Sequence, residues 1–258
     1  MQLSDKTILI TGASTGIGRE LAIKLAANNN RLILLARRVE LLNQIKDEIG
    51  ENNRIDIYQC DVSDYEQVKT VLTSILSKYK IIDLSILNSG VSFRNSIENF
   101  DSCMAKKTFD INVMGVIYCI EQLLPMYIKE RRGVIAGVSS LADARGFAKS
   151  SFYCASKAAL SIYLEGLRGE LIPYGVKVIT IKPGFVKTPM TDKNEFRMPL
   201  LMNVDKAVNI IIMGIQKEKT VIQFPLIISL AVKLLKFIPN FIFDFISSNQ
   251  IKIIGKKD

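Results

Sequence analysis

The chain has 258 residues, of which 48% are hydrophobic and 23% charged, and its net charge is +9. This length fits one large α/β domain, and no stretch rich in Pro, Gly or Ser marks an internal boundary. The chain contains no His, which excludes Ser-His-Asp and Cys-His nucleophile systems, His-ligated zinc and proton transfer by His. We expect no metal site, and a proton donor must be another side chain.

The cysteines and basic residues set broader expectations. The cysteines at 60, 103, 119 and 154 form no C-x-x-C pair, and the first strand begins too close to Met1 for a cleaved export signal. Free thiols in a cytoplasmic protein are therefore expected. The positive charge fits cofactor phosphates, an anionic membrane surface or nucleic acid, but scattered basic residues without a recognition motif argue against nucleic acid.

Short β-branched runs alternate with longer helical patterns along the chain. We expect strands at 6–11, 31–36, 54–60, 83–88, 133–139, 176–183 and 220–224, and helices at 16–29, 38–49, 64–79, 103–130, 151–172 and 204–217. This alternation specifies a parallel sheet with helices on both faces. The predicted fold class is α/β: a single Rossmann-like, doubly wound domain of seven parallel strands over 1–225, with ligands at the carboxyl ends of the strands.

A glycine-rich loop, TGASTGIG, lies at 11–18 between the first strand and the first helix. Gly12 permits a tight turn, Gly16 permits close approach of the backbone to a pyrophosphate, and Gly18 permits close helix packing. The phosphates would lie at the positive end of the helix. Alone, such a loop is also compatible with an ordinary strand-to-helix turn. Its other candidate cofactor contacts are Ser14, Thr15 and Ile17.

Polar residues follow the next three strands. Arg37 and Arg38 end the second strand, where an acid would favour NAD and two guanidinium groups favour the 2′-phosphate of NADP. Asp61 and Val62 end the third strand, where an adenine edge would lie, and 88–90 (Asn-Ser-Gly) ends the fourth, beside the expected ribose. Each could be a turn or cap in isolation. Their shared place at the carboxyl ends of successive strands favours an NADP(H) site, with Asn88 and Gly90 as contacts.

Tyr153 and Lys157 lie four residues apart on a predicted helix. Both side chains therefore project from one face, separated along the axis by roughly 6 Å. A nearby ammonium lowers the pKa of a phenol from its usual value of about 10. This pair could therefore exchange a proton with a carbonyl or an alcohol.

The same spacing occurs at Tyr65 and Lys69, on a helix where no active site is expected. Ser140 distinguishes the pair at Tyr153 from the pair at Tyr65. It ends the fifth strand, where its hydroxyl could reach the same substrate oxygen as Tyr153. Ser139 is the adjacent competitor for this role.

Over about residues 5–225 the sequence resembles the short-chain dehydrogenase/reductase family. The family's TGxxxGxG loop matches 11–18, and its Ser and Y-x-[AS]-S-K elements match VSS at 138–140 and YCASK at 153–157. Its N-A-G element corresponds to 88–90, although Leu87 stands where the fuller motif usually has another Asn, and Ser89 replaces Ala.

This resemblance implies specific site residues. The implied catalytic set is Asn112, Ser140, Tyr153 and Lys157, with Asn112 also bending its helix. Tyr153 and Lys157 would also contact the cofactor. The residues implied around the nicotinamide carboxamide, in PGFVKT, are Pro183, Gly184, Val186 and Thr188.

The resemblance also implies a reaction: hydride transfer between NADP(H) and a carbonyl or secondary alcohol. The first choice is a carbonyl reductase or alcohol dehydrogenase with an apolar, lipid-like substrate. The alternatives are dehydratase or epimerase chemistry, and a catalytically weak nucleotide sensor or scaffold. Family resemblance further suggests a homodimer or homotetramer built on the helices at 103–130 and 151–172.

Two apolar segments lie late in the chain. Residues 188–202 occupy the position of a substrate-covering loop and carry several Met and Leu, although ordinary core packing is an equal alternative. In the extension at 226–258, the part at 226–246 predicts an amphipathic helix, with Ser229, Lys233 and Lys236 on one face. Its uncharged runs are too short to span a bilayer. It could pack on the domain, contact a partner subunit, close over substrate, or lie on a membrane as a peripheral contact.

Overall fold

The computed structural model describes residues 1–50, 54–194, 196, 198–245 and 247. Its centre is a sheet of seven parallel strands in the order β3-β2-β1-β4-β5-β6-β7. The strands are β1 (Thr7–Thr11), β2 (Arg31–Ala36), β3 (Arg54–Gln59), β4 (Leu84–Leu87), β5 (Val134–Val138), β6 (Lys177–Pro183) and β7 (Val221–Phe224). The predicted seven-stranded, doubly wound α/β fold is therefore confirmed.

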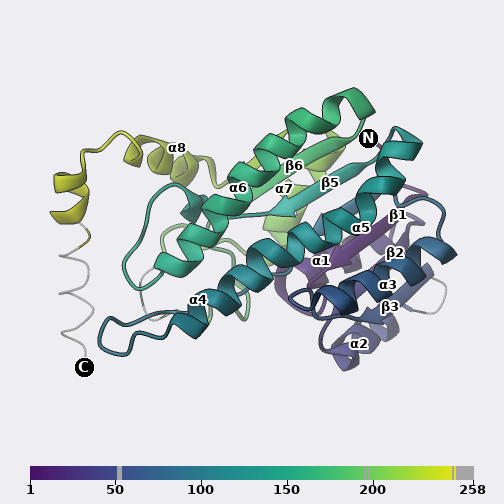
Figure 1. The fold of residues 1–258 in the computed structure, drawn as a ribbon, viewed down its shortest axis with the longest axis horizontal. Coiled ribbons are helices and arrows are strands. Elements are labelled where there is room, and N and C mark those ends of the chain that lie inside the picture. Colours follow the sequence, from purple (N-terminus) through teal and green to yellow (C-terminus); the bar gives the residue numbers. More distant parts are fainter. Residues whose placement is uncertain (51–53, 195, 197, 246, 248–258) are drawn as a thin grey trace.

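Helices cover both faces of this sheet (Figure 1). One face carries α1 (Gly16–Ala26), α2 (Val39–Ile49) and α7 (Val204–Gln216). The other carries α3 (Tyr65–Lys78), α5 (Gly115–Glu130) and α6 (Ser151–Leu171). Every residue of β4 and β5 is buried, because helices cover them on both sides. This explains why the central strands read as continuous apolar runs rather than as alternating patterns.

The helix expected at 103–130 is not uniform. It consists of α4 (Ser102–Phe109), a π-helical turn (Asp110–Met114) and α5. Ser102–Glu130 is long enough to span a membrane, and an 18-residue window within it has a mean hydropathy of 1.4. Its apolar side chains nevertheless pack on the sheet and on α3, as expected of a core helix.

The extension after β7 begins with helix α8 (Leu226–Leu235), as the sequence predicts. Its orientation is unexpected: Leu226, Ile227 and Leu230 are exposed, whereas Ser229 is buried. Ile228, Val232 and Leu235 are half-buried against the domain, so only part of the apolar surface of this helix packs on it. Residues 246 and 248–258 of the predicted extension lie outside the described residues.

A buried hydrogen bond joins α5 to the sheet. Tyr127 of α5 is fully buried, and its hydroxyl lies 2.7 Å from Ser85 Oγ of β4. The same hydroxyl donates to the carbonyl oxygen of Val134 in β5 at 3.3 Å. Burial raises the pKa of the Tyr127 phenol, so the group stays neutral.

We expect Tyr127→Phe to lower the free energy of unfolding by about 1–3 kcal/mol, because it leaves the buried Ser85 hydroxyl without its partner. Urea denaturation measures this loss. The matched control is the double variant with Ser85→Ala, which removes both polar groups and should lose less than the sum of the two single changes. Strict additivity would show that the two hydroxyls do not interact.

Candidate active site

A cleft lies at the carboxyl ends of the strands, on both sides of the point between β1 and β4 where the strand order reverses. The predicted site residues that line it are Gly12, Ser14, Thr15, Gly16, Ile17, Arg37, Arg38, Asp61, Val62, Asn88, Gly90, Ser140, Tyr153, Lys157, Pro183, Gly184, Val186 and Thr188. Gly18 and Asn112 lie behind this lining. The structure therefore brings together residues that are far apart in the sequence.

The glycine-rich loop is shaped to admit an anion. Gly12 and Gly16 have φ of +64° and +59°, a region that favours glycine. A Cβ on Gly18 would lie 2.3 Å from the carbonyl oxygen of Gly12, so only glycine fits there. Thr15 makes no side-chain cap on α1, whereas Asp64 caps α3. The first-turn amides of α1 thus remain available for an anionic ligand, which fits the pyrophosphate of a dinucleotide.

The turn after β4 is held by Thr11 at the end of β1. Thr11 Oγ1 accepts hydrogen bonds from the backbone amides of Asn88 and Ser89 at 3.0 and 3.2 Å. Asn88 Nδ2 donates to the carbonyl oxygens of Thr11 and Gly12 at 3.2 and 3.1 Å. Leu87, which replaces the family's first Asn, is a buried strand residue. These bonds fix the turn to the phosphate-binding loop.

Two guanidinium groups lie at the rim of the cleft. Arg38 Nη2 donates to Ser14 Oγ in the glycine-rich loop at 3.4 Å. Arg37 Nη1 lies 3.8 Å from Asp61 Oδ2, and its side chain is 60% exposed. The other carboxylate oxygen of Asp61 accepts hydrogen bonds from Ser63. Both arginines are therefore accessible to a phosphate bound beside β2.

Lys157 and Tyr153 project into the cleft from α6. Lys157 is 3% exposed, and its Nζ donates to the carbonyl oxygen of Val138 at 2.8 Å. The same Nζ lies 5.8 Å from the centre of the Tyr153 ring. Burial disfavours the charged ammonium and lowers the pKa of Lys157 from 10.5 to about 8.

The phenol of Tyr153 behaves differently from the sequence expectation. Burial raises its pKa, and the hydrogen bond with the Ser140 side chain opposes this only in part. The sequence had suggested that the ammonium of Lys157 lowers this pKa. In the cofactor-free protein, removal of the phenol from water is the larger effect, so Tyr153 stays protonated.

Asn112 lies in the π-helical turn and is completely buried. Its Oδ1 accepts from the backbone amide of Val91 at 2.8 Å, and its Nδ2 donates to the Val91 carbonyl oxygen and to Ser156 Oγ at 2.9 and 3.0 Å. Both amide protons are thus used within the protein. In this structure Asn112 ties the bent helix to the turn after β4 and to α6.

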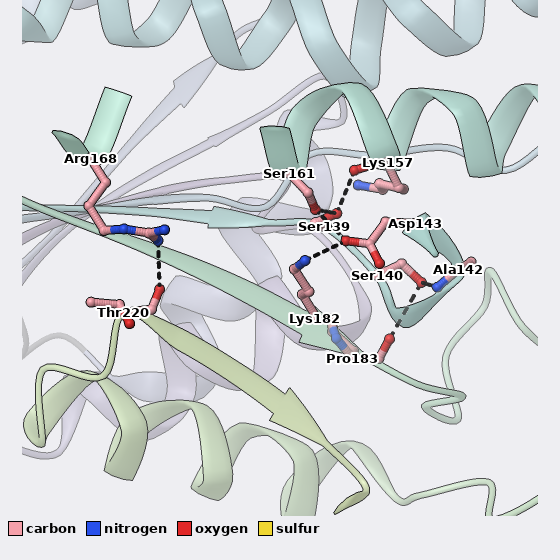
Figure 2. Close-up of polar contacts among 10 residues, drawn as sticks. All are labelled: Ser139, Ser140, Ala142, Asp143, Lys157, Ser161, Arg168, Lys182, Pro183 and Thr220. Atoms are coloured by element: carbon pink, nitrogen blue, oxygen red, sulfur yellow. Dashed lines mark hydrogen bonds and ion pairs between the residues drawn. The ribbon is translucent and has the colours of Figure 1, made fainter. Parts of the chain in front are cut away.

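A polar network that the sequence did not reveal lies behind Ser140 (Figure 2). Asp143 Oδ2 lies 2.6 Å from Lys182 Nζ and 2.6 Å from Ser161 Oγ, and the Asp143 side chain is 7% exposed. Ser161 Oγ lies 2.8 Å from Ser139 Oγ, which donates to the Lys157 carbonyl oxygen at 2.9 Å. The network joins β5, β6 and α6 behind the cleft.

This network also distinguishes the two adjacent serines. The hydroxyl proton of Ser139 is used by the Lys157 carbonyl oxygen. Ser140 Oγ accepts from the Ala142 amide at 3.1 Å, and its donor contact to Pro183 O is long, at 3.4 Å. Ser140 is therefore the serine whose hydroxyl faces the cleft, where it hydrogen-bonds with Tyr153 and can reach a substrate.

The second Tyr-x-x-x-Lys pair belongs elsewhere. Tyr65 begins α3, and its hydroxyl donates to Glu121 Oε1 of α5 at 2.8 Å. Tyr65 does not line the cleft.

The cysteines at 60, 103, 119 and 154 are free thiols, as predicted. Burial raises the pKa of the Cys60 thiol to about 11, which keeps it protonated at the cleft wall.

A doubly wound sheet, an uncapped glycine-rich helix start and a buried Ser-Tyr-Lys group define the class of nucleotide-dependent oxidoreductases. Comparison with known proteins agrees with this assignment. The family described as short chain dehydrogenase matches residues 6–198. The chain belongs to the short-chain dehydrogenase/reductase family and is an NAD(P)-dependent oxidoreductase.

Individual relatives share about a third of their residues or fewer with this chain. An uncharacterized oxidoreductase of Myxococcus xanthus is 34% identical over 94% of this chain and 96% of its own length. A fatty acyl-CoA reductase of Acinetobacter baylyi is 30% identical over 84% of this chain and 75% of its own length. A Burkholderia phymatum short chain dehydrogenase/reductase, solved with NAD, has a TM-score of 0.81 at 21% identity, covering 91% of this chain and 94% of its own. The last comparison shows the shared fold.

The pKa of Lys157 predicts a pH-dependent stability in the cofactor-free protein. Below about pH 8 the folded protein holds a charged buried amine, and this cost is fully present. As the pH rises from about 8 towards 10.5, the folded form loses this proton while the unfolded chain still binds it, so stability increases.

We therefore expect the unfolding free energy of the wild type, relative to Lys157→Met, to rise by roughly 2 kcal/mol between pH 7 and pH 10. The comparison cancels titrations elsewhere and the constant effect of losing the bond to Val138. Denaturation curves at the two pH values measure it. A difference that stays constant would place the Lys157 pKa near its ordinary value.

Proposed function

We propose that the protein is an NADP(H)-dependent reductase or dehydrogenase that acts on the carbonyl or secondary alcohol of an apolar, lipid-like substrate. One observation carries this proposal: a protonated phenol, the serine hydroxyl that hydrogen-bonds with it and a buried amine share one cleft wall. Bound NADPH would supply the hydride. The chain must then orient the carbonyl and deliver a proton.

The side chains suit these two tasks. Ser140 can hydrogen-bond the substrate oxygen, because its hydroxyl lies beside Tyr153 and its contact to the Pro183 carbonyl oxygen is long. Tyr153 can donate the proton to the same oxygen, because burial keeps the phenol protonated. Lys157 can hold the ribose hydroxyls, and with a pKa of about 8 it carries a charge at neutral pH. That charge would stabilise the phenolate that remains after proton transfer.

The substrate class is inferred from the residues beyond the cofactor site. Met190 lines the cleft and is 39% exposed, and Leu200 and Leu201 are exposed on the same segment. Phe196 of this segment packs against Phe185, with ring centroids 5.8 Å apart. The similarity to a fatty acyl-CoA reductase supports an apolar chain as part of the substrate.

The preference for NADP(H) rests on Arg37 and Arg38. Two arginines at the end of β2, next to Ser14 of the glycine-rich loop, suit the extra phosphate of NADP. A carboxylate at that position would repel the phosphate and bind ribose hydroxyls instead.

Tyr153→Phe should reduce turnover at least about a thousandfold, because the ring remains and only the proton donor is lost. NADPH oxidation over a panel of long-chain and short-chain carbonyls measures turnover, and quenching of NADPH fluorescence measures binding. Tyr65→Phe is the matched control, since it repeats the change outside the cleft. A Tyr153→Phe enzyme with near-native rates would refute the assignment. NADPH binding without turnover by the wild type would support a sensor instead.

Replacing Arg37 and Arg38 together by Gln should weaken NADPH binding by about a hundredfold while changing NADH binding much less, since charge-assisted bonds to the 2′-phosphate are lost. Titration of both nucleotides gives the two dissociation constants. Arg19→Gln, a change on the exposed side of α1, serves as the control for the loss of a guanidinium group outside the cleft. If the ratio of the two constants stays unchanged, these arginines do not select the cofactor.

A further inference from the structure

The C-terminal part of the structure exposes a continuous set of large apolar side chains. We name the C-terminal apolar surface after its members, which lie on α8 and the residues that follow it: Leu226, Ile227, Leu230, Leu234, Phe237, Phe241, Ile242 and Phe245. Each is at least 40% exposed, and Phe237 reaches 85%. Single exposed apolar residues are ordinary, whereas a contiguous set marks a surface that binds something.

Helix α8 buries Ser229 against the domain, whereas Lys233 and Lys236 of the same predicted polar face are exposed. Ser229 is 1% exposed, and its buried hydroxyl has no hydrogen-bond partner among the described residues. Four residues away on the next turn, Lys233 is exposed at the border of the apolar face. A helix that only packs on its own domain would bury its leucines and expose its serine. The outward leucines therefore need another apolar environment.

The segment after α8 is fixed to the protein by specific contacts. Arg145 Nη1 donates to the carbonyl oxygen of Ile238 at 3.3 Å, and its guanidinium carbon lies 4.1 Å from the centre of the Phe243 ring. Phe147 packs against Phe243, with ring centroids 6.2 Å apart. Phe243 thus packs on the body of the protein, while the side chain of Phe241 is 75% exposed. These contacts hold the apolar surface beside Arg145 and Phe147 in the segment that follows Ser140.

The surface has the charge of a membrane-binding element. Lys233 and Lys236 are exposed beside the apolar face, and Asp244 is the one acidic residue in 226–245. The whole chain carries a net charge of +9, which favours approach to an anionic surface. Helix α8 has ten residues, about half the length needed to span a bilayer. A short helix with outward Leu and Ile, followed by exposed Phe and flanked by Lys, suits insertion at the lipid–water interface.

We propose that the C-terminal apolar surface binds the face of a lipid bilayer that contains anionic headgroups. The apolar side chains enter the boundary between headgroups and acyl chains, and Lys233 and Lys236 contact the headgroups. Binding of this kind is peripheral and reversible, because no span is formed. It requires neither the cofactor nor the reaction.

Flotation with vesicles tests this with the full-length protein. One vesicle preparation contains phosphatidylcholine alone, and a second also contains anionic phosphatidylglycerol. The wild type should float with the anionic vesicles. Leu230→Glu combined with Leu234→Glu should lower the bound fraction at least tenfold, because two charges would enter the apolar boundary. Met213→Glu, on exposed Met213 of α7, should bind like the wild type.

The lysines provide a second, independent arm. Lys233→Gln with Lys236→Gln should reduce binding to anionic vesicles about tenfold and leave binding to phosphatidylcholine vesicles nearly unchanged. All changed side chains are exposed, so thermal unfolding and NADPH binding should match the wild type.

Two results would overturn the proposal. One is a wild type that does not float with anionic vesicles, or a Leu230→Glu, Leu234→Glu variant that floats as well as the wild type. The other is a wild type that does not bind vesicles and that light scattering shows to be an oligomer without lipid, while the Leu230→Glu, Leu234→Glu variant has the mass of a single chain. The second result would assign the surface to contacts between copies of the chain. Neither depends on turnover of a carbonyl.

Discussion

The parallel direction of all seven strands is the constraint on which the site depends. Because each strand returns through a helix to the same starting edge, every carboxyl end lies at one edge of the sheet. Between β1 and β4 the chain turns to opposite sides, and the loops diverge to leave a cleft. Thr11 at the end of β1 then holds the turn after β4 through its hydroxyl. The end of β1 therefore positions both the phosphate-binding loop and the turn after β4.

Burial determines the proton chemistry of this cleft. It shifts the pKa of Lys157 down and that of Tyr153 up, and both shifts favour the neutral form. Lys157 is compensated by a hydrogen bond to the Val138 carbonyl oxygen and Tyr153 by one with the Ser140 side chain, rather than by a nearby carboxylate. The carboxylate that does lie close, Asp143, is already paired with Lys182 and Ser161. It therefore stabilises the wall behind Ser140 instead of competing for the phenol.

The two apolar features of the second half of the chain point to related ligands. The segment at 188–202 places Met190 at the cleft and leaves Leu200 and Leu201 exposed. The C-terminal apolar surface lies beside the segment that follows Ser140, through the contacts of Arg145 and Phe147 with Phe243. An apolar substrate and a lipid surface are thus proposed for neighbouring parts of one molecule. Both proposals rest on the same observation, which is that large apolar side chains lie outside the core of the protein.

The sequence by itself determined the fold class and most of the cleft lining. Strand runs, helix patterns and glycine spacing are local signals, and the parallel topology then assigns every strand end to one edge. Even the decoy pair Tyr65 and Lys69 was recognisable, since no serine stands thirteen positions before Tyr65 as Ser140 stands before Tyr153. The long helix at 103–130 was placed correctly as a whole, but its π-helical turn was not, because that bend depends on the contacts of Asn112 with Val91 and Ser156.

Only the tertiary structure decided which hydroxyl of Ser139 and Ser140 can reach a substrate, which way α8 faces, and whether Tyr153 loses its proton easily. Each of these depends on burial and on partners far away in the chain. Lys182 lies 39 positions after Asp143, and no spacing rule joins them. The periodicity of α8 shows that the helix has two faces, but it carries no information about which face meets the protein, because that is settled by packing against other elements.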